Sequence, residues 1–319
     1  MSRFLISPQY NPYLNIAVET ALLNAPSDGE MTLYLWQNQY TVVIGQNQNP
    51  YAECDVARLE ADGGYLMRRR TGGGAVFHDV GNINFSFIAP NGCYDQQRQF
   101  GVLQRALGAL GLEVEVSGRN DLLCQGRKIS GSAFSRGREQ RLHHGTLLID
   151  TDVAAMQRYL KPNVAKLQKH GVASVRSRVA NIADLLPQTP REEVLPLLRS
   201  RVGEAFAQEY GTPQVLDWDD VVSLPQVQQL YEDYASPEWK YGRWQQFRAT
   251  RSQLFDWGWV EVALTIDEAS ATISDCTIAS DSLFPDTIAE AERLLRGAST
   301  LAAPPSDNPI ISDILSLLY

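Results

Sequence analysis

The sequence predicts an α+β fold in which helices flank a mixed, largely antiparallel sheet, followed by a small α+β C-terminal domain. In the first half of the chain, short β-rich runs are joined by tight turns and not by long helical crossovers. A polar segment at 236–246 then precedes a last region with strands and helices of its own. We therefore expect one domain over residues 1–239 and a second over residues 247–319.

The composition is that of an ordinary globular protein with an acidic balance. The 319 residues are 44% hydrophobic and 20% charged, and the formal net charge is −9. This charge argues against general nucleic-acid binding. Basic side chains nevertheless gather at 68–70, 119–141 and 158–178, which favours a small anionic ligand over a polyanion.

Hydropathy and cysteine usage indicate the compartment. No apolar run follows Met1, and no run of about 18 apolar residues occurs, so we expect a soluble cytoplasmic protein without a membrane partner. The four cysteines, Cys54, Cys93, Cys124 and Cys276, form no Cys-x-x-Cys pair, which fits a reducing compartment and argues against zinc. The four histidines also lack the spacing of metal ligands.

The first elements follow from caps and β-rich runs. Asn11 before Pro12 predicts a helix start, with asparagine as the cap and proline at the first helical position. The runs at 32–36 and 41–44 predict two strands that pair as a hairpin. Residues 55–61 suggest a short helix.

The middle of the chain alternates strands and one clear helix. Alternating apolar and polar residues at 83–87 predict a half-buried strand, and the apolar spacing across 100–110 predicts a helix. Strands are expected at 112–116 and 142–150. Between them, Gly126-Arg127 reads as the two-residue loop of a type II′ hairpin.

The remaining elements are mostly helical until the last region. Residues 153–169 look helical, and the basic stretch 171–178 has no period, so we interpret it as a mobile loop and a candidate lid. Thr189 to Glu192 matches a capping box before a helix. The last region is expected to contain strands at 257–266 and 271–278 and helices at 285–295 and 311–318.

A run of arginines and glycines is the strongest local signal. Arg68 to Arg70 precede Thr71 and the three glycines Gly72 to Gly74. Consecutive glycines let the backbone take positive φ and lie directly against a ligand, and free amide groups beside arginines suit phosphate or carboxylate. The spacing fits neither standard phosphate-binding motif. The alternative is a glycine-rich hairpin with a solvated basic entry.

Lys128 is the candidate for catalysis because of its neighbours. It begins a strand and stands near the small residues Gly131 and Ser132, which would leave a ligand channel open to its positive charge. The other reading is a surface lysine on a hairpin. We expect the arginine–glycine run to converge with 117–121, 128–133 and 144–146.

Several motifs in order resemble one family. They are Arg-Arg-x-x-Gly-Gly-Gly-Ala-Val-Phe-His-Asp at 68–79, Ser-Gly-Arg-Asn-Asp at 117–121, Lys-x-Ser-Gly-Ser-Ala at 128–133 and His-His-Gly-Thr-Leu-Leu at 143–148. This set closely resembles bacterial lipoate–protein ligase in its long form, which carries a small C-terminal accessory domain. The resemblance extends to about residue 239 and continues more weakly to the end.

The resemblance implies the biotin/lipoate ligase fold and a two-step reaction. Lipoate and ATP, with Mg²⁺, give lipoyl-AMP and pyrophosphate, and a lysine of an acceptor lipoyl domain then takes the lipoyl group as an amide. The implied acceptors are the lipoyl domains of 2-oxoacid dehydrogenase complexes and the glycine cleavage H protein. The motif positions imply these roles: Lys128 is catalytic and contacts both lipoate and ATP, Arg69, Gly74, Ala75, Val76 and Phe77 hold ATP, Gly72 and Gly73 admit lipoate, and Asp121 binds Mg²⁺.

Two other classes of function stay open. A lipoyl or octanoyl transferase of the same fold would use a preformed acyl donor, in some cases through a cysteine nucleophile. Cys124 lies near Lys128, but its apolar neighbours suggest a buried and inert thiol. A sensing module that binds lipoate or nucleotide without turnover is the non-enzyme alternative. Pyrophosphate release from ATP with free lipoate distinguishes the ligase from both.

Overall fold

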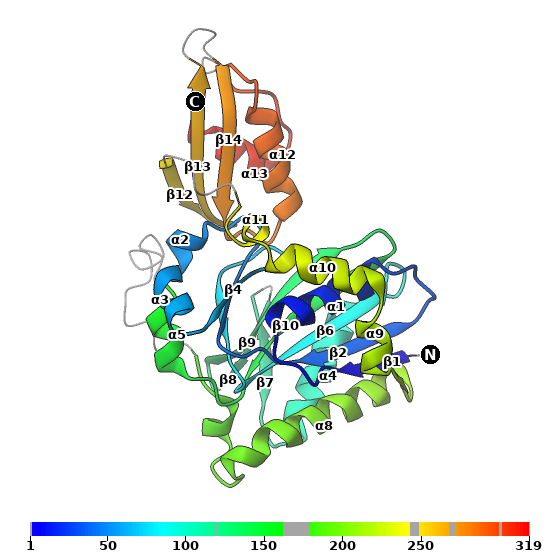
Figure 1. The fold of residues 1–319 in the computed structure, drawn as a ribbon. Helices are drawn as coiled ribbons and strands as arrows, with labels where there is room; N and C mark the ends of the chain where they lie inside the picture. Colours follow the sequence, from blue (N-terminus) through cyan, green and yellow to red (C-terminus); the bar gives the residue numbers. More distant parts are fainter. Residues whose placement is uncertain are drawn as a thin grey trace.

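A mixed sheet forms the centre of the larger part of the molecule. The computed structural model describes residues 2–118, 120–161, 179–242, 249–267, 272–299 and 302–318. Within these ranges eight strands form one sheet in the order β11-β1-β2-β6-β10-β9-β8-β7 (Figure 1). β1 runs parallel to β2 and β11, and the other neighbouring strands of this sheet pair antiparallel. The strands are β1 (Ser2–Ile6), β2 (Met31–Trp36), β6 (Asn82–Pro90), β7 (Val114–Ser117), β8 (Asp121–Cys124), β9 (Arg127–Arg136), β10 (Gln140–Leu148) and β11 (Gln214–Val215). The expected α+β, largely antiparallel architecture is confirmed.

A second, three-stranded sheet among the described residues carries the arginine–glycine run. Its order is β4 (Tyr65–Arg68), β3 (Thr41–Ile44), β5 (Val76–His78), with β3 parallel to β4 and antiparallel to β5. The predicted hairpin of β2 with β3 is therefore wrong, because the two strands lie in different sheets. The connection between them is held inside the protein: the buried Asn38 side chain bonds to Asn15 on α1 and to His78 on β5.

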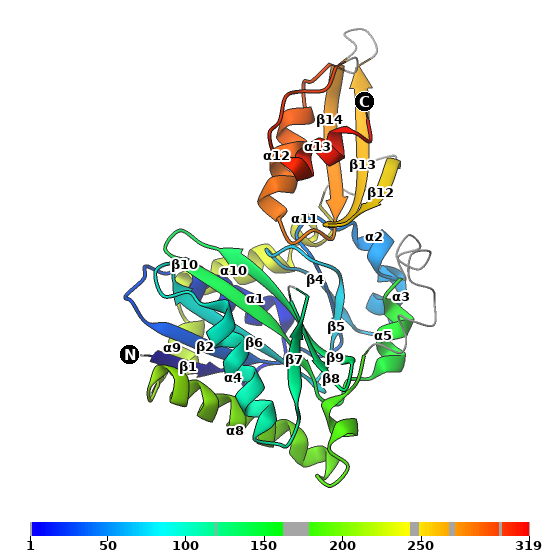
Figure 2. The same cartoon turned by 180° about the vertical axis from the view of Figure 1, so that it is seen from behind.

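Helices cover both faces of the large sheet. α4 (Gln96–Gly108) and α8 (Arg191–Tyr210) pack on one face, and α1 (Pro12–Asn24) and α10 (Pro225–Ala235) pack on the other (Figures 1 and 2). Successive side chains of β2 alternate between these two cores, as the pleat requires. The shorter described helices are α2 (Pro50–Glu53), α3 (Val56–Ala61), α5 (Val153–Tyr159), a 3₁₀ turn (Ile182–Leu185), α9 (Trp218–Val222) and α11 (Pro237–Lys240).

Helix starts follow the sequence signals in part. The Asn11 side chain accepts hydrogen bonds from the first turn of α1, so that cap is confirmed. The capping box predicted at Thr189 is wrong: Pro190 is the cap residue of α8, and no side chain caps the helix, since proline has no side-chain acceptor. α5 covers the start of the predicted 153–169 helix, whereas 162–170 and the candidate lid at 171–178 lie outside the described residues.

Two local predictions about strands need correction. Gln125 and Gly126 form the β8–β9 loop with φ of 52° and 70°, so the turn has the two positive φ angles of type I′ and is not type II′. β6 was expected to be half-buried, but all nine of its residues are buried. Its polar face is buried as well, because Ser86 bonds to Glu19 and to Trp36 across the α1 side of the sheet.

Residues 249–318 contain a further sheet with its own apolar cluster. β12 (Ala249–Phe255), β13 (Gly258–Asp267) and β14 (Thr272–Ser280) pair antiparallel, and α12 (Pro285–Leu295) and α13 (Pro309–Leu315) pack against them (Figure 1). The expected strands and helices are present, and β12 is an addition. None of the helices in the described ranges has the length and apolar character needed to cross a membrane.

Candidate active site

The predicted segments converge on one cavity of about 270 Å³. Its walls include Arg69 and the loop 73–76, the β9 segment that contains Lys128 and 131–133, and residues 144–146 of β10. Asn120 contributes from the turn before β8. All four segments singled out in the sequence therefore reach the same space, which confirms their predicted convergence.

Lys128 lies in this cavity because the residue three positions later has no side chain. Its ammonium Nζ is 2.8 Å from Asp121 Oδ1 on the neighbouring strand, and its side chain is 37% exposed. A Cβ at Gly131 would lie 2.9 Å from Nζ and 3.0 Å from Cε, so the lysine folds back over Gly131. Across the strand pair, a Cβ at Gly145 would stand 2.6 Å from the Gly131 carbonyl oxygen. Gly131 thus leaves space for the ammonium, and Gly145 allows the close approach of β10 to the Gly131 carbonyl.

Arg69 holds the loop from inside. Only 7% of it is exposed, and its guanidinium donates to Thr71 Oγ1 (2.9 Å), Gly72 O (2.7 Å) and Gly74 O (2.9 Å). Burial lowers the pKa of this guanidinium to about 10, which leaves it charged at neutral pH. Arg69 thus lines the cavity and at the same time fixes the carbonyls of the glycine loop.

The three consecutive glycines have different surroundings. Gly73 has φ +94°, a left-handed conformation that suits glycine, and its N–H donates to Ser282 O at 2.8 Å. A Cβ at Gly72 would lie 2.1 Å from the same Ser282 oxygen, so Gly72 makes room for the C-terminal region and does not line the 270 Å³ cavity. Gly74 does line the cavity, and a Cβ there would meet no atom within 4 Å.

The other residues predicted to bind ATP also differ in whether they line the cavity. Ala75 and Val76 line the cavity. Phe77 is 2% exposed and packs edge-on against Tyr40 and tilted against Tyr159, so its side chain belongs to the core behind the loop.

A buried chain of hydrogen bonds runs through one wall of the cavity that contains Lys128. Thr71 Oγ1 is 2.9 Å from His144 Nε2, and His144 Nδ1 is 2.8 Å from Glu19 Oε1. Because a carboxylate accepts, the imidazole donates from Nδ1 and accepts from the Thr71 hydroxyl at Nε2. Ser86 Oγ donates to the same Glu19 oxygen at 2.5 Å, and Arg69 donates to Thr71. The chain therefore ends on a carboxylate that is 3% exposed.

Glu19 is the main residue that the sequence reasoning missed. It stands on α1 one turn after Asn15, and both polar side chains are buried on a helix whose other buried positions are mostly apolar. That spacing was the available signal, since two polar residues four apart share a helix face. What they contact could not be read from the helix alone, because His144 is 125 residues away.

His78 supplies a further polar group to the cavity. Its Nδ1 accepts from Asn38 Nδ2 at 3.2 Å, so the neutral ring carries its proton on Nε2, and that nitrogen is buried without a partner in the part of the chain that the structure describes. Burial, and then the nearby Arg69 and His144, lower the pKa of His78 to about 3. The ring is therefore neutral at pH 7 and has an unused donor.

The cysteines offer no nucleophile to this cavity. Cys124 is 2% exposed on β8, and burial raises its pKa, which disfavours the reactive thiolate. Burial likewise raises the pKa of Cys54 to about 12. Within the described residues, no cysteine lines the cavity around Lys128.

A metal ion would find one carboxylate near Lys128. No cluster of three or more histidine, cysteine or acidic side chains suitable for a metal occurs in the described part of the chain. Mg²⁺ bound with a nucleotide usually needs only one or two protein carboxylates, because substrate phosphates and water complete its shell. Asp121 fits that requirement.

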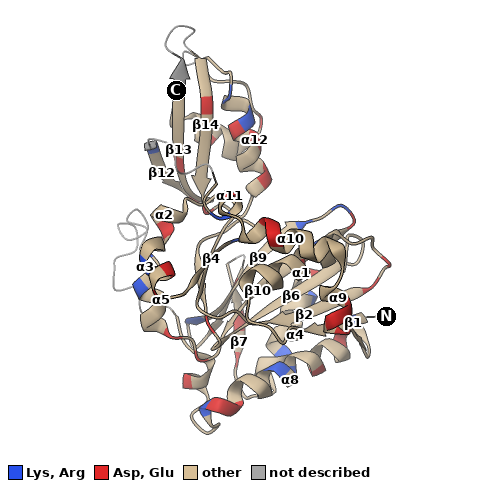
Figure 3. Cartoon of the chain, in the orientation of Figure 1, with Lys and Arg blue, Asp and Glu red and all other residues tan. Residues whose placement is uncertain are grey.

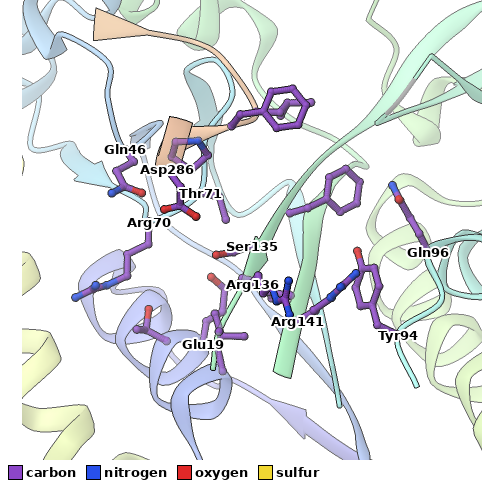
Figure 4. Close-up of a pocket in the computed structure, with 18 of the residues that line it drawn as sticks. Glu19, Gln46, Arg70, Thr71, Tyr94, Gln96, Ser135, Arg136, Arg141 and Asp286 are labelled. Atoms are coloured by element: carbon purple, nitrogen blue, oxygen red, sulfur yellow. The ribbon is translucent and has the colours of Figure 1, made fainter. Parts of the chain in front are cut away.

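A second, larger cavity of about 960 Å³ lies between the large sheet region and the C-terminal region (Figure 4). Glu19 and Thr71 line it, so the chain of hydrogen bonds through His144 separates it from the inner cavity. Arg136 and Arg141 line its outer wall, and residues 283–287 line the opposite side.

Family models of lipoate ligases match both parts of the chain. The family model "Lipoyl protein ligase A/B catalytic domain" matches residues 11–202, and "Bacterial lipoate protein ligase C-terminus" matches residues 245–302. Lipoate-protein ligase A of Psychrobacter cryohalolentis is 36% identical over 290 residues, which cover 90% of this chain and 85% of that protein.

Solved structures share the fold. LipL1 of P. falciparum, crystallised in complex with lipoate, superposes with a TM-score of 0.81 and 24% identity, covering 99% of this chain and 98% of that one. A lipoate-protein ligase A bound with ATP gives a TM-score of 0.62 at 24% identity, over 76% of this chain and 98% of its own. With the family matches over both parts and the convergence of the motifs on one cavity, the chain belongs to the lipoate–protein ligase A family.

Proposed function

We propose that this chain is an ATP-dependent lipoate–protein ligase in which both steps take place at the cavity around Lys128. The observation that carries the proposal is the position of the Lys128 ammonium. It lies in a cavity bounded by a glycine loop, over Gly131, which has no side chain to fill the space. Relatives solved with lipoate and with ATP share the fold around it.

In the first step a lipoate carboxylate oxygen attacks the α-phosphorus of ATP, and pyrophosphate leaves. Both reactants are anionic, so a positioned cation lowers the repulsion between them and stabilises the charge of the transition state. We propose that Lys128 has this role and contacts the lipoyl carbonyl oxygen and the phosphate when both are bound. Asp121 Oδ1 lies 2.8 Å from its ammonium.

The loop supplies the nucleotide contacts in this proposal. Gly74, Ala75 and Val76 line the cavity and can present backbone groups to ATP, with Arg69 fixing their geometry from behind. Phe77 supports the loop from the core. Gly73 lines the cavity and admits the lipoyl chain, while Gly72 acts at the contact with Ser282.

We propose that Mg²⁺ binds together with ATP at this site. It would neutralise the phosphate charge, with Asp121 as the protein ligand. The neighbouring ammonium of Lys128 stays within reach of the same carboxylate and of the substrate anions.

In the second step the amine of an acceptor lysine attacks the acyl carbon of lipoyl-AMP, the new amide forms and AMP leaves. We propose lipoyl domains of 2-oxoacid dehydrogenase complexes and the glycine cleavage H protein as acceptors, and the cytoplasm as the compartment. A structure of a related bi-partite ligase of Thermoplasma acidophilum with its E2 lipoyl domain supports this class of partner. The division into domains 1–239 and 247–319 belongs to the same proposal.

Pyrophosphate release tests the function. Purified protein with ATP and free lipoate should release pyrophosphate and retain lipoyl-AMP, in the absence of any acceptor. Release that fails with free lipoate, together with acyl transfer from a preformed lipoyl-AMP or octanoyl carrier, would identify the transferase instead. Binding of lipoate and ATP without either reaction would identify a sensing module.

A further inference from the structure

Two arginines stand side by side at the outer cavity. Arg136 on β9 and Arg141 on β10 are directly opposite partners in the antiparallel ladder. Both line the 960 Å³ cavity, and Figure 4 shows their side chains close together next to Tyr94. The Arg141 guanidinium carbon lies 5.4 Å from the centre of the Tyr94 ring. The tyrosine therefore helps to hold Arg141 toward the cavity.

This pair lacks the carboxylate partners that some other arginines have. Like charges directly opposite in a ladder destabilise the strand pair. In the described ranges neither arginine forms an ion pair, and the Arg141 Nε atom is buried without a hydrogen-bond partner. By contrast, the described arginines that do have a carboxylate partner include Arg3, Arg98, Arg105, Arg191, Arg201 and Arg296. An anionic group of a bound molecule would offset the repulsion between the two guanidinium groups.

The acids of the same cavity do not supply that anion. Glu19 is committed to His144 and Ser86. Asp286, in the first turn of α12, also lines the cavity and makes no ion pair with either arginine. Arg136, which is exposed, and Arg141 are therefore available to an anionic group that enters the cavity.

The position favours a protein over a small substrate. β9 runs from the inner cavity at Gly131 to Arg136, five residues that span roughly 16 Å at the usual rise of a strand. A group held at Lys128 is therefore far from the arginine pair, whereas a folded acceptor that inserts one lysine covers such a distance with its surface. The chain has a net charge of −9, and Figure 3 shows acidic and basic positions interspersed along the ribbon of both parts. An acidic partner therefore needs a local basic site.

We propose that Arg136 and Arg141 are a docking site for acidic side chains of the acceptor domain, beside the entry path of its lysine. This inference rests on the proposed ligase function. It assigns the pair to recognition of the protein substrate and gives it no part in adenylate formation.

The test separates the two steps in the full-length protein. The variant Arg136→Ala/Arg141→Ala is compared with Arg138→Ala, which removes an exposed arginine of the same hairpin that does not line the cavity. Pyrophosphate release with ATP and free lipoate reports the first step and the integrity of the fold. Transfer to an isolated lipoyl domain, at several acceptor concentrations and at low and high salt, reports the second.

The double variant should release pyrophosphate at the wild-type rate and show an acceptor KM about tenfold higher at low salt, as expected for about 0.7 kcal/mol from each lost charge pair. Wild-type KM should rise with salt, and that of the double variant should not. Arg138→Ala should match wild type in both assays. An unchanged acceptor KM would overturn the docking site, and so would an equal loss in both steps or a raised KM for ATP or lipoate. Wild-type protein without pyrophosphate release would instead refute the ligase function.

Discussion

Lys128 is the residue on which the proposed adenylate formation depends most. Replacing it with alanine should lower adenylate formation by about two to four orders of magnitude, since it removes the main electrostatic stabiliser between two anions. The measurement is pyrophosphate release with saturating ATP and lipoate. Arg127→Ala, one residue earlier on the same strand and outside the cavity lining, is the control and should keep near wild-type release. Near-normal release by Lys128→Ala would remove the lysine from its role.

Gly131 should matter because of the lysine that folds over it. Alanine at this position places a Cβ 2.9 Å from Lys128 Nζ, so the flexible end of the lysine must move away from the reacting atoms. We expect kcat for adenylate formation to fall by up to about 100-fold with unchanged thermal stability, since small misplacements of catalytic groups have effects of this size. Gly92→Ala is the matched control, because a Cβ there meets no atom within 4 Å. Equal rates for the two variants would show that the displaced lysine is harmless.

At the residue scale, the site could be predicted from the sequence where a charged side chain stands beside residues that the backbone requires to be small. Lys128 and the glycine run stood out because cations beside small residues are unusual, and the left-handed Gly73 explains why glycine stands there. The motif positions imply that Phe77 holds ATP and Gly72 admits lipoate, whereas the Phe77 ring packs in the core and Gly72 lies against Ser282 of the C-terminal region. Glu19 was missed because its partner is distant in sequence.

The strand β10 carries a buried histidine with a consequence for stability. His143 is fully buried, bonds to Gln99 and Ser132, and is surrounded by phenylalanine rings. Burial, and then the neighbouring His144, lower its pKa to about 3 from 6.5. Between these values the unfolded chain binds a proton that the folded protein does not, so stability falls as pH drops from 6.5 toward 3 and is independent of this residue above pH 7.

Urea unfolding at pH 4, 5, 6 and 8 measures this effect. His143→Gln can keep both hydrogen bonds and has no proton to bind. The free energy of unfolding of wild type should lose up to about 1.4 kcal/mol more per pH unit than the variant between pH 6 and 4, the value for one proton. The slopes should agree above pH 7. Parallel curves at low pH would mean that His143 is already protonated in the folded state.

At the element scale, periodicity identified strands and helices but not their partners. β2 and β3 were each recognised, yet their pairing was wrong because Asn38 and its buried bonds direct the chain into another sheet. β6 looked half-buried because alternation does not reveal that its polar face is covered by α1. The short strands β1 and β12 were not recognised from the local sequence.

The contact between the two parts of the molecule is made at the glycine loop. Gly73 N donates to Ser282 O, and Ser280 N donates to Asn47 O at 3.1 Å. The segment expected to be a polar linker begins with the helix α11, which Arg68 fixes by bonds to the carbonyls of Trp239 and Lys240. The C-terminal region therefore rests on the loop that we assign to substrate binding.

Hydrogen exchange can test whether this contact changes during the reaction. Adenylate formation excludes water, whereas transfer admits a protein lysine, and one static arrangement serves both poorly. Lipoyl-AMP should therefore alter exchange at 236–246, at 280–285 and at 171–178. Residues 243–246 and 171–178 lie outside the described residues. A lipoate-only sample is the control. A change confined to the loop 69–76 would argue against movement of the C-terminal region.

A lipoylated acceptor domain is the product that most directly identifies a ligase acting through Lys128. Protein incubated with ATP, free lipoate and an isolated lipoyl domain should add one lipoyl group to that domain, seen by intact mass, with no addition when ATP is omitted or when Lys128→Ala replaces the wild type. An acceptor of unchanged mass with active wild-type protein, or a lipoyl group added without ATP, would contradict the assignment of this chain as a ligase acting through Lys128.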